Sequence, residues 1–208
     1  MLSLGELHAL GVKYWKIADV PAGAEVETTW EQSLKLQEIR EAQGFKNYDI
    51  VNVSTAGTPA EKLAIFFAEH LHEDEEIRFI LRGGGCFDVR SARDRWVRIH
   101  VVLHDLIVIP AGIYHRFSLD DAGAATALRL FQDAPKWIAI NRSKEASRLD
   151  AHIKWLSFVA AQATPPPPSP SSSSSSTGPS SSSSSSPSSN VSPNGISYDQ
   201  NPPEKNSR

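Results

Sequence analysis

The sequence predicts a mainly β domain, an antiparallel barrel or jelly roll, with helices before and after the strands and a disordered tail. Three observations predict this architecture. Short runs rich in β-branched and aromatic residues recur between residues 70 and 141, separated by turn residues. The first 70 residues instead carry helix-start signals at helical spacing. In residues 164–190, 23 of 27 positions are Ser or Pro, a composition that cannot bury a core.

The first 70 residues are expected to be mostly helical. Ser3 and Glu6 have the spacing of a capping box, so the first helix should begin there and stop at Gly11. A second helix is expected from Thr28 or Thr29 to about Gly44, because apolar residues recur there at helical spacing.

Two further helices flank the predicted strands. Thr58, Pro59 and Glu61 have the pattern of a cap, a first helical residue and a closing acid, so a third helix should begin there and end before His70. The last helix is expected across residues 147–162, where apolar residues lie on one side.

Seven strands are expected between the third and the last helix, because each run is rich in residues that favour strands. Gly83, Gly84 and Gly85 should form a turn between the first two of them. The predicted strands are residues 77–81, 86–90, 96–102, 106–110, 115–119, 127–131 and 137–141.

Composition excludes several classes of protein. Lys and Arg total 21 against 24 for Asp and Glu, with no basic stripe, so we expect no nucleic-acid partner. No apolar run reaches the roughly 20 residues of a membrane span. Cys86 is the only cysteine and the N-terminus lacks signal-peptide features, so we expect a cytoplasmic protein, small enough for a nuclear pool.

Residues 1–163 should form one domain and 164–208 the disordered tail.

A cluster of metal-ligating side chains lies where the strands begin. His70 and His72 alternate on a strand and so share a face, and Glu76 opens the next strand after an acidic turn. Two imidazoles and a carboxylate from adjacent strands match the ligand set of non-haem Fe(II) and related metals. A His-x-His pair alone is more often a surface strand, so the prediction depends on the whole set.

A further histidine follows a rigid turn. Pro110 fixes its own φ, and Gly112 permits a backbone conformation that other residues avoid. The turn should therefore direct His115 inward at the start of a strand.

These motifs resemble the two cupin motifs. His70, His72, Glu76 and Gly83 follow the spacing of the first motif, and the segment from Pro110 to His115 that of the second. More narrowly, EHLHEDEEIRFIL, CFDVR, DRWVRI, DLIVIPAGIYHRFSLD and ALRLF resemble the acireductone dioxygenase family of methionine salvage, as do the helical segments GVKYWKI and NYDIVNV. The resemblance covers about residues 4–162.

The resemblance implies a cupin double-stranded β-helix and a metal-dependent dioxygenase. Its metal ligands carry over as His70, His72, Glu76 and His115, holding one Fe(II) or Ni(II) ion per chain. The substrates would be acireductone (1,2-dihydroxy-3-keto-5-methylthiopentene) and O2. The Fe(II) form would release 2-keto-4-methylthiobutyrate and formate, and the Ni(II) form 3-methylthiopropionate, formate and carbon monoxide. The oligomeric state stays open, and a monomer is compatible with the sequence.

Two arginines match family arginines near the substrate. Arg78 and Arg129 could each stabilise the enediolate, or else pair with an acidic neighbour in a purely structural role. Two alternatives to the family's activity also stay open: another cupin dioxygenase or isomerase with the same ligands, and a non-catalytic cupin that binds a partner.

Two other histidines have simpler interpretations. His104 stands where the family usually has Gly, in a turn that needs a positive φ, so it should be strained. His152 falls on the last predicted helix, where a surface or partly buried position is expected. The chain also lacks a short segment that the family carries before GVKYW, which should expose an edge or an apolar patch.

Overall fold

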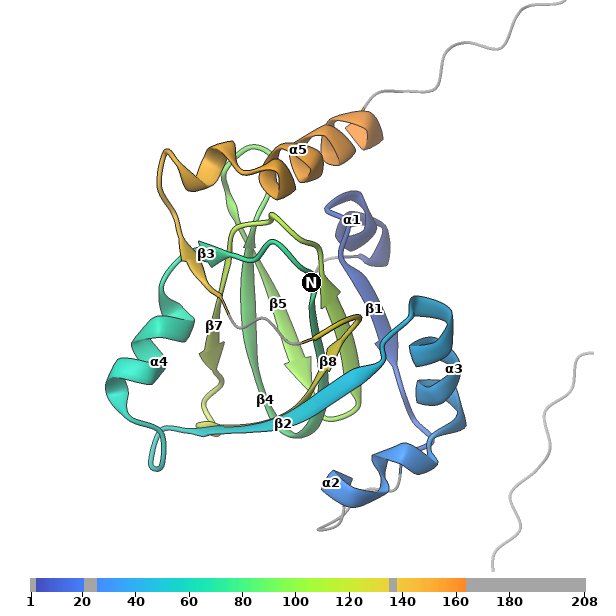
Figure 1. Ribbon diagram of the computed structural model, residues 1–208. Helices are drawn as coiled ribbons and strands as arrows, with labels where there is room; N and C mark the ends of the chain where they lie inside the picture. Colours follow the sequence, from blue (N-terminus) through green and yellow to red (C-terminus); the bar gives the residue numbers. More distant parts are fainter. Residues whose placement is uncertain (1–2, 21–25, 135–137, 164–208) are drawn as a thin grey trace, which may run out of the picture. The chain divides into compact units, whose positions relative to one another are not determined.

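The computed structural model describes residues 3–20, 26–134 and 138–163 (Figure 1). The predicted tail, residues 164–208, lies outside the described residues. The predicted mainly β class is confirmed: within the described residues nine strands form antiparallel ladders, and helices flank them. No described helix is both long and apolar enough to cross a membrane.

Strands occupy most of the region between residues 47 and 131. Two of the predicted strands, β5 and β7, have the predicted bounds. The strands are β1 (Lys13–Lys16), β2 (Asn47–Ser54), β3 (His70–Leu71), β4 (Glu76–Arg90), β5 (Trp96–Val102), β6 (Asp105–Ile109), β7 (His115–Leu119), β8 (Ala124–Phe131) and β9 (Ile140–Asn141).

The long strand β4 belongs to two sheets. Its first half pairs with β6 and β8, and its second half pairs with β5 and β7. The turn expected at Gly83 to Gly85 is therefore wrong, because the strand continues through it. Glycine is needed there for close strand approach: a Cβ on Gly83 would lie 2.0 Å from the carbonyl oxygen of Ala124. The two predicted strands are one strand that changes sheets.

The expectation of a mostly helical N-terminal region is wrong at two places. KYWK forms β1, which pairs with β6, and NYDIVNVS forms β2, which pairs with β8 along its whole length. Both segments are rich in aromatic and β-branched residues, and strand partners far along the chain decide their conformation. Residue 137 of the last predicted strand lies outside the described residues, and of residues 138–141 only Ile140–Asn141 pairs.

The helices are α1 (Leu4–Ala9), α2 (Val26–Thr29), α3 (Leu34–Gln43), α4 (Ala60–Phe67) and α5 (Asp150–Ala163). The capping box of Ser3 and Glu6 is present at α1, as predicted. The single second helix is wrong: it is divided into α2, a 3-10 turn and α3, because Ser33 caps α3 by accepting from the N–H of Leu36 at 2.9 Å. The third helix begins one residue late, with Pro59 as its cap.

Two apolar clusters hold these elements together. One joins α1 and α5 to the strands, and Figure 1 shows these two helices near each other at one end of the barrel. Trp155 of α5 also donates its indole N–H to the carbonyl of Leu10 at 2.9 Å. The other cluster packs Trp30 and α3 against β4, β6 and β8. These two clusters therefore hold in place the strands that carry the predicted ligands.

Candidate metal centre

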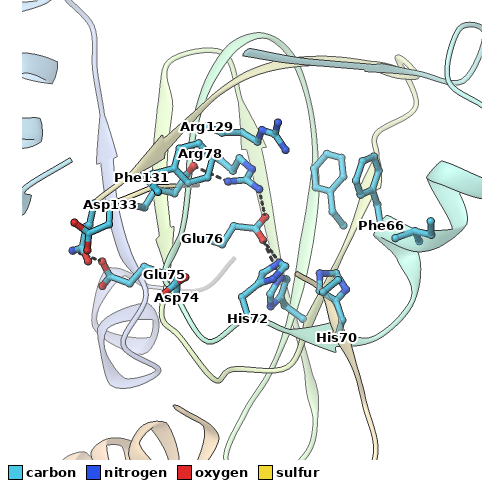
Figure 2. A pocket seen from close by; sticks show the side chains of 17 residues that line it. Phe66, His70, His72, Asp74, Glu75, Glu76, Arg78, Arg129, Phe131 and Asp133 are labelled. Atoms are coloured by element: carbon cyan, nitrogen blue, oxygen red, sulfur yellow. Dashed lines mark hydrogen bonds and ion pairs between the residues drawn. The ribbon is translucent and has the colours of Figure 1, made fainter. Parts of the chain in front are cut away.

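The four predicted ligands converge on one point. One ligand atom from each of His70, His72, Glu76 and His115 lies within 4.8 Å of the others, and Figure 2 shows the labelled ones directed toward a common space. His70 and His115 are paired residues of β3 and β7, whereas Glu76 begins the half of β4 that pairs with β6. The expected convergence from adjacent strands is thus corrected: Glu76 comes from the other sheet.

Backbone carbonyls orient all three imidazoles in the same way. The Nδ1 atom of His70 lies 2.7 Å from the carbonyl of Ala68, and that of His72 lies 2.6 Å from the carbonyl of Ile138. The carbonyl of Ile113 lies 3.0 Å from Nδ1 of His115. A carbonyl can only accept, so each Nδ1 carries the hydrogen and each Nε2 keeps its lone pair for a metal.

The electrostatics favour the metal-binding forms of His70 and Glu76, whereas Glu76 outweighs burial and raises the pKa of His72. Burial, helped by the neighbouring His115, lowers the pKa of His70 to about 4, so this imidazole is neutral at neutral pH. Burial raises the pKa of Glu76, but Arg78 and the imidazoles of His115 and His72 outweigh it and hold that pKa well below its usual value. A carboxylate beside neutral imidazole nitrogens is a donor set that fits a divalent metal ion.

The carboxylate of Glu76 lies so close to two imidazole nitrogens that this arrangement needs a cation. Its Oε2 lies 3.0 Å from Nε2 of His72 and 3.2 Å from Nε2 of His115. Nitrogen and oxygen lone pairs this close repel one another unless a positive charge stands between them. A shared proton or a metal ion bound by all of them satisfies this arrangement.

The two predicted arginines lie side by side on the wall of the site. Arg78 and Arg129 are paired residues of β4 and β8. Arg78 reaches Glu76, with Nη2 at 3.3 Å from Oε1, and Arg129 makes two bonds to the carboxylate of Asp49, at 2.5 and 2.6 Å. Sequence reasoning missed Asp49, which lies opposite Arg129 on β2, because that segment was expected to be helical.

A cavity that is partly open to solvent lies beside the ligands. It is lined by both arginines, by Phe66 and Phe117, and on its outer side by Asp74 and Asp133. A second, more apolar cavity shares the two arginines and is lined by Val51, Val53, Ile80, Phe87, Ala125 and Ala127. The site thus joins a charged inner wall to an apolar recess.

The turn before His115 has the predicted form. Gly112 has a φ of 81°, which only glycine adopts without strain, and His115 begins β7. His104 also has the predicted positive φ, at 72°. The expectation for His152 is wrong, because its side chain is buried against this same turn.

The comparisons with known proteins agree with this geometry. The model of the ARD/ARD' family matches residues 2–139. "Acireductone dioxygenase 1" of Coprinopsis cinerea is 47% identical over 161 residues, covering 76% of this chain and 85% of that relative. "Acireductone dioxygenase" of Rattus norvegicus is 41% identical over 165 residues, covering 78% of this chain and 86% of that relative.

A solved structure supports the same conclusion. The acireductone dioxygenase from Bacillus anthracis, described with a cadmium ion in its active centre, is 27% identical and has a TM-score of 0.57. The match covers 65% of this chain and 86% of that one, and it confirms the cupin fold. On its sequence, its fold and its three-histidine, one-glutamate centre, the chain is a metal-dependent dioxygenase that belongs to the ARD/ARD' family.

Proposed function

We propose that this chain cleaves acireductone with O2 in the methionine salvage pathway, using one Fe(II) or Ni(II) ion held by His70, His72, Glu76 and His115. The observation that carries the proposal is the convergence of these four ligands beside two arginines at the base of a cavity. The names of the relatives at 47% and 41% identity supply the substrate. The proposal includes a cytoplasmic location with a nuclear pool, and a monomer.

The chain's own residues prepare the site for an anionic substrate. When bound by His70, His72, Glu76 and His115, the metal would supply Lewis acidity and the redox chemistry with O2. Glu76 and three imidazole nitrogens would leave a bound divalent ion with net positive charge, which favours the enediolate form. The guanidinium of Arg78 lies beside this carboxylate and adds a second positive group for the developing negative charge.

The other side chains of the cavity position the substrate. Arg129 is held by Asp49, so its charge is partly neutralised and its main effect is to fix the wall beside Arg78. The apolar recess lined by Val51 and Ile80 suits a short apolar chain such as the methylthio end of acireductone. The arginine wall and the apolar recess would together hold the substrate with its reacting carbons toward the ligands.

The two metals predict different products from the same protein. Purified protein loaded with Fe(II) should consume acireductone and O2 one to one and release formate with the 2-keto acid. Loading with Ni(II) should instead give 3-methylthiopropionate, formate and carbon monoxide. Gas analysis and chromatography of the acids measure both, and Glu75→Gln, at the rim of the cavity, is the matched control for Glu76→Gln.

The expected result is turnover in the wild type and in Glu75→Gln, with loss of metal and activity in Glu76→Gln. Acireductone decay at its uncatalysed rate in a metal-loaded wild-type protein would contradict the proposal. That outcome would favour a cupin that binds without catalysing.

A further inference from the structure

His152 of α5 holds the backbone of the turn that precedes His115. Its side chain is 8% exposed, and its Nδ1 lies 2.7 Å from the carbonyl oxygen of Gly112. Because a carbonyl only accepts, Nδ1 is the donor. The imidazole lies between two aromatic rings, with centroids 4.9 Å away at Tyr114 and 5.7 Å away at Trp155. The ring therefore has little freedom, and its hydrogen bond has a fixed direction.

Gly112 connects this contact to two metal ligands. Its N–H donates to the carbonyl of His72 at 2.8 Å. A Cβ at Gly112 would lie 2.2 Å from the carbonyl oxygen of Ala151, so the turn and the start of α5 are in direct contact. The next carbonyl along the chain, that of Ile113, accepts from Nδ1 of His115 at 3.0 Å. The peptide groups on both sides of Gly112 are thus fixed, one by His72 and the other by α5.

We propose that His152 is a positioning residue for the metal centre. Its hydrogen bond fixes the peptide between Gly112 and Ile113. That peptide fixes the carbonyl that orients His115, and the N–H of Gly112 fixes the backbone of His72. Without the donor, the carbonyl of Gly112 is buried unpaired and its peptide plane rotates toward another partner. Both ligands move with that rotation, because buried polar groups are under strong pressure to be satisfied.

The inference deepens the proposed function and rests on it for the identity of the centre. Its test does not need acireductone. Groups that orient metal ligands from behind typically change metal affinity when they are removed. The affinity of the full-length protein for Ni(II), measured by competition with a chelator, is therefore the direct readout. Inactivity of the loaded wild type would count against the proposed function and leave the affinity comparison intact.

Two substitutions separate the hydrogen bond from simple packing. In His152→Asn the amide nitrogen takes the place of Nδ1, whereas in His152→Gln it takes the place of Nε2. We expect His152→Gln to weaken Ni(II) binding about tenfold or more, and His152→Asn to stay within about threefold of the wild type. Wild-type affinity in His152→Gln, or equal losses in both variants, would overturn the proposal.

Val159→Ala is the matched control for general damage to α5. Val159 is buried in the same helix, away from the turn, so its truncation should lower the thermal midpoint by several degrees and leave the Ni(II) affinity unchanged. An affinity loss in this variant as large as that in His152→Gln would show that destabilised α5, and not the hydrogen bond, weakens metal binding.

A measurement on the unaltered protein covers the case in which His152→Gln does not fold. Metal binding and the hydrogen bond must stabilise each other to the same extent, since coupling is reciprocal. Exchange of the Nδ1 hydrogen of His152, followed by nuclear magnetic resonance, should therefore slow at least about threefold when Zn(II) is added. Exchange that Zn(II) leaves unchanged would overturn the proposal.

Discussion

The two arginines of the cavity differ in how much of their charge is available. Arg78 contacts the carboxylate of Glu76, which is a proposed metal ligand. Arg129 instead donates two hydrogen bonds to the carboxylate of Asp49. A guanidinium already paired in this way contributes less to an incoming anion. We therefore expect Arg78 to act on the substrate and Arg129 to hold the wall of the cavity in place.

Replacing each arginine by methionine tests this difference. Arg78→Met should lower kcat/KM about 100-fold, the usual cost of removing one positioned donor from a developing oxyanion. Arg129→Met should cost about tenfold, and chiefly through KM. Steady-state kinetics with equal metal content in both proteins measure the two effects. A larger loss in Arg129→Met than in Arg78→Met would contradict the assignment.

Asp88 gives the folded protein a pH dependence that lies outside the metal centre. Arg98 and Arg116 donate to its buried carboxylate at 2.7 to 3.0 Å. The hydrogen bond from Arg98 leads the causes that lower the pKa of Asp88, and Arg116 adds to it. A carboxyl with a lowered folded-state pKa stabilises the fold above its unfolded pKa of about 3.9, and the contribution is lost as the pH falls through the folded value.

Asp88→Asn should therefore lower the free energy of unfolding at pH 7 and flatten its fall between about pH 5 and pH 3. Denaturant titrations of the metal-free protein at several pH values measure both. Asp121→Asn, at an exposed site, should keep the wild-type slope. An Asp88→Asn protein whose stability falls as steeply with acid as the wild type would contradict this account.

The turn between β5 and β6 contains a residue in a conformation that it adopts at a cost. His104 has a φ of 72°, yet its N–H bonds to the carbonyl of Ile80 and its carbonyl accepts from Ile17. Its Nε2 is buried without a hydrogen-bond partner among the described residues. The backbone bonds hold the strained residue in place, and its side chain adds an unsatisfied polar atom.

His104→Gly should therefore raise the free energy of unfolding by about 1 kcal/mol, since it removes the strain and keeps both backbone bonds. His104→Ala is the matched control, because it removes the ring with its unsatisfied nitrogen and retains the backbone strain, so it should stabilise less than His104→Gly. Chemical denaturation of the three proteins side by side gives the comparison. Equal stability changes in the two variants would show that the ring, and not the backbone, sets the cost.

Local signals predicted the elements whose conformation is decided locally. The capping box at Ser3 placed α1, and short runs of strand-favouring residues placed β5 and β7. Elements decided by distant partners were missed. β1 and β2 are strands because β6 and β8 pair with them, and nothing within either segment carries that information. The glycines of β4 are typical of a turn when taken alone, yet they allow the close approach of neighbouring strands.

The same division applies to the site. The four ligands were predictable because cupin spacing fixes them along the chain. Asp49, which holds Arg129, and His152, which holds Gly112, were not predictable as site residues, because each acts across a long sequence separation. Spacing identifies ligands, whereas the residues that orient them are found only after the chain has folded.

At the scale of the whole molecule, both sheets contribute residues to the metal centre. One sheet supplies His70 and His115, and the other supplies Glu76 and the arginine wall. The α5 helix joins this centre to α1 through Trp155. Catalytic competence is therefore a property of the assembled domain and not of any one strand pair.

Residues 164–208 take no part in this assembly as we propose it. Removing them should leave metal affinity, turnover and the thermal midpoint unchanged, because every proposed ligand and wall residue lies before residue 164. The comparison of residues 1–163 with the full chain in the same assays measures this. A large loss of turnover in the shortened protein would show that the tail acts on the domain.

The central claim is that one metal ion in this four-ligand centre carries the activity. Metal-free protein titrated with Fe(II), with acireductone-dependent O2 uptake followed at each addition, tests it most directly. The account predicts a rate that rises in proportion to the iron added and stops rising at one equivalent per chain, with no such rise in His115→Ala. Uptake that continues to rise past one equivalent, or an unchanged titration in His115→Ala, would contradict it.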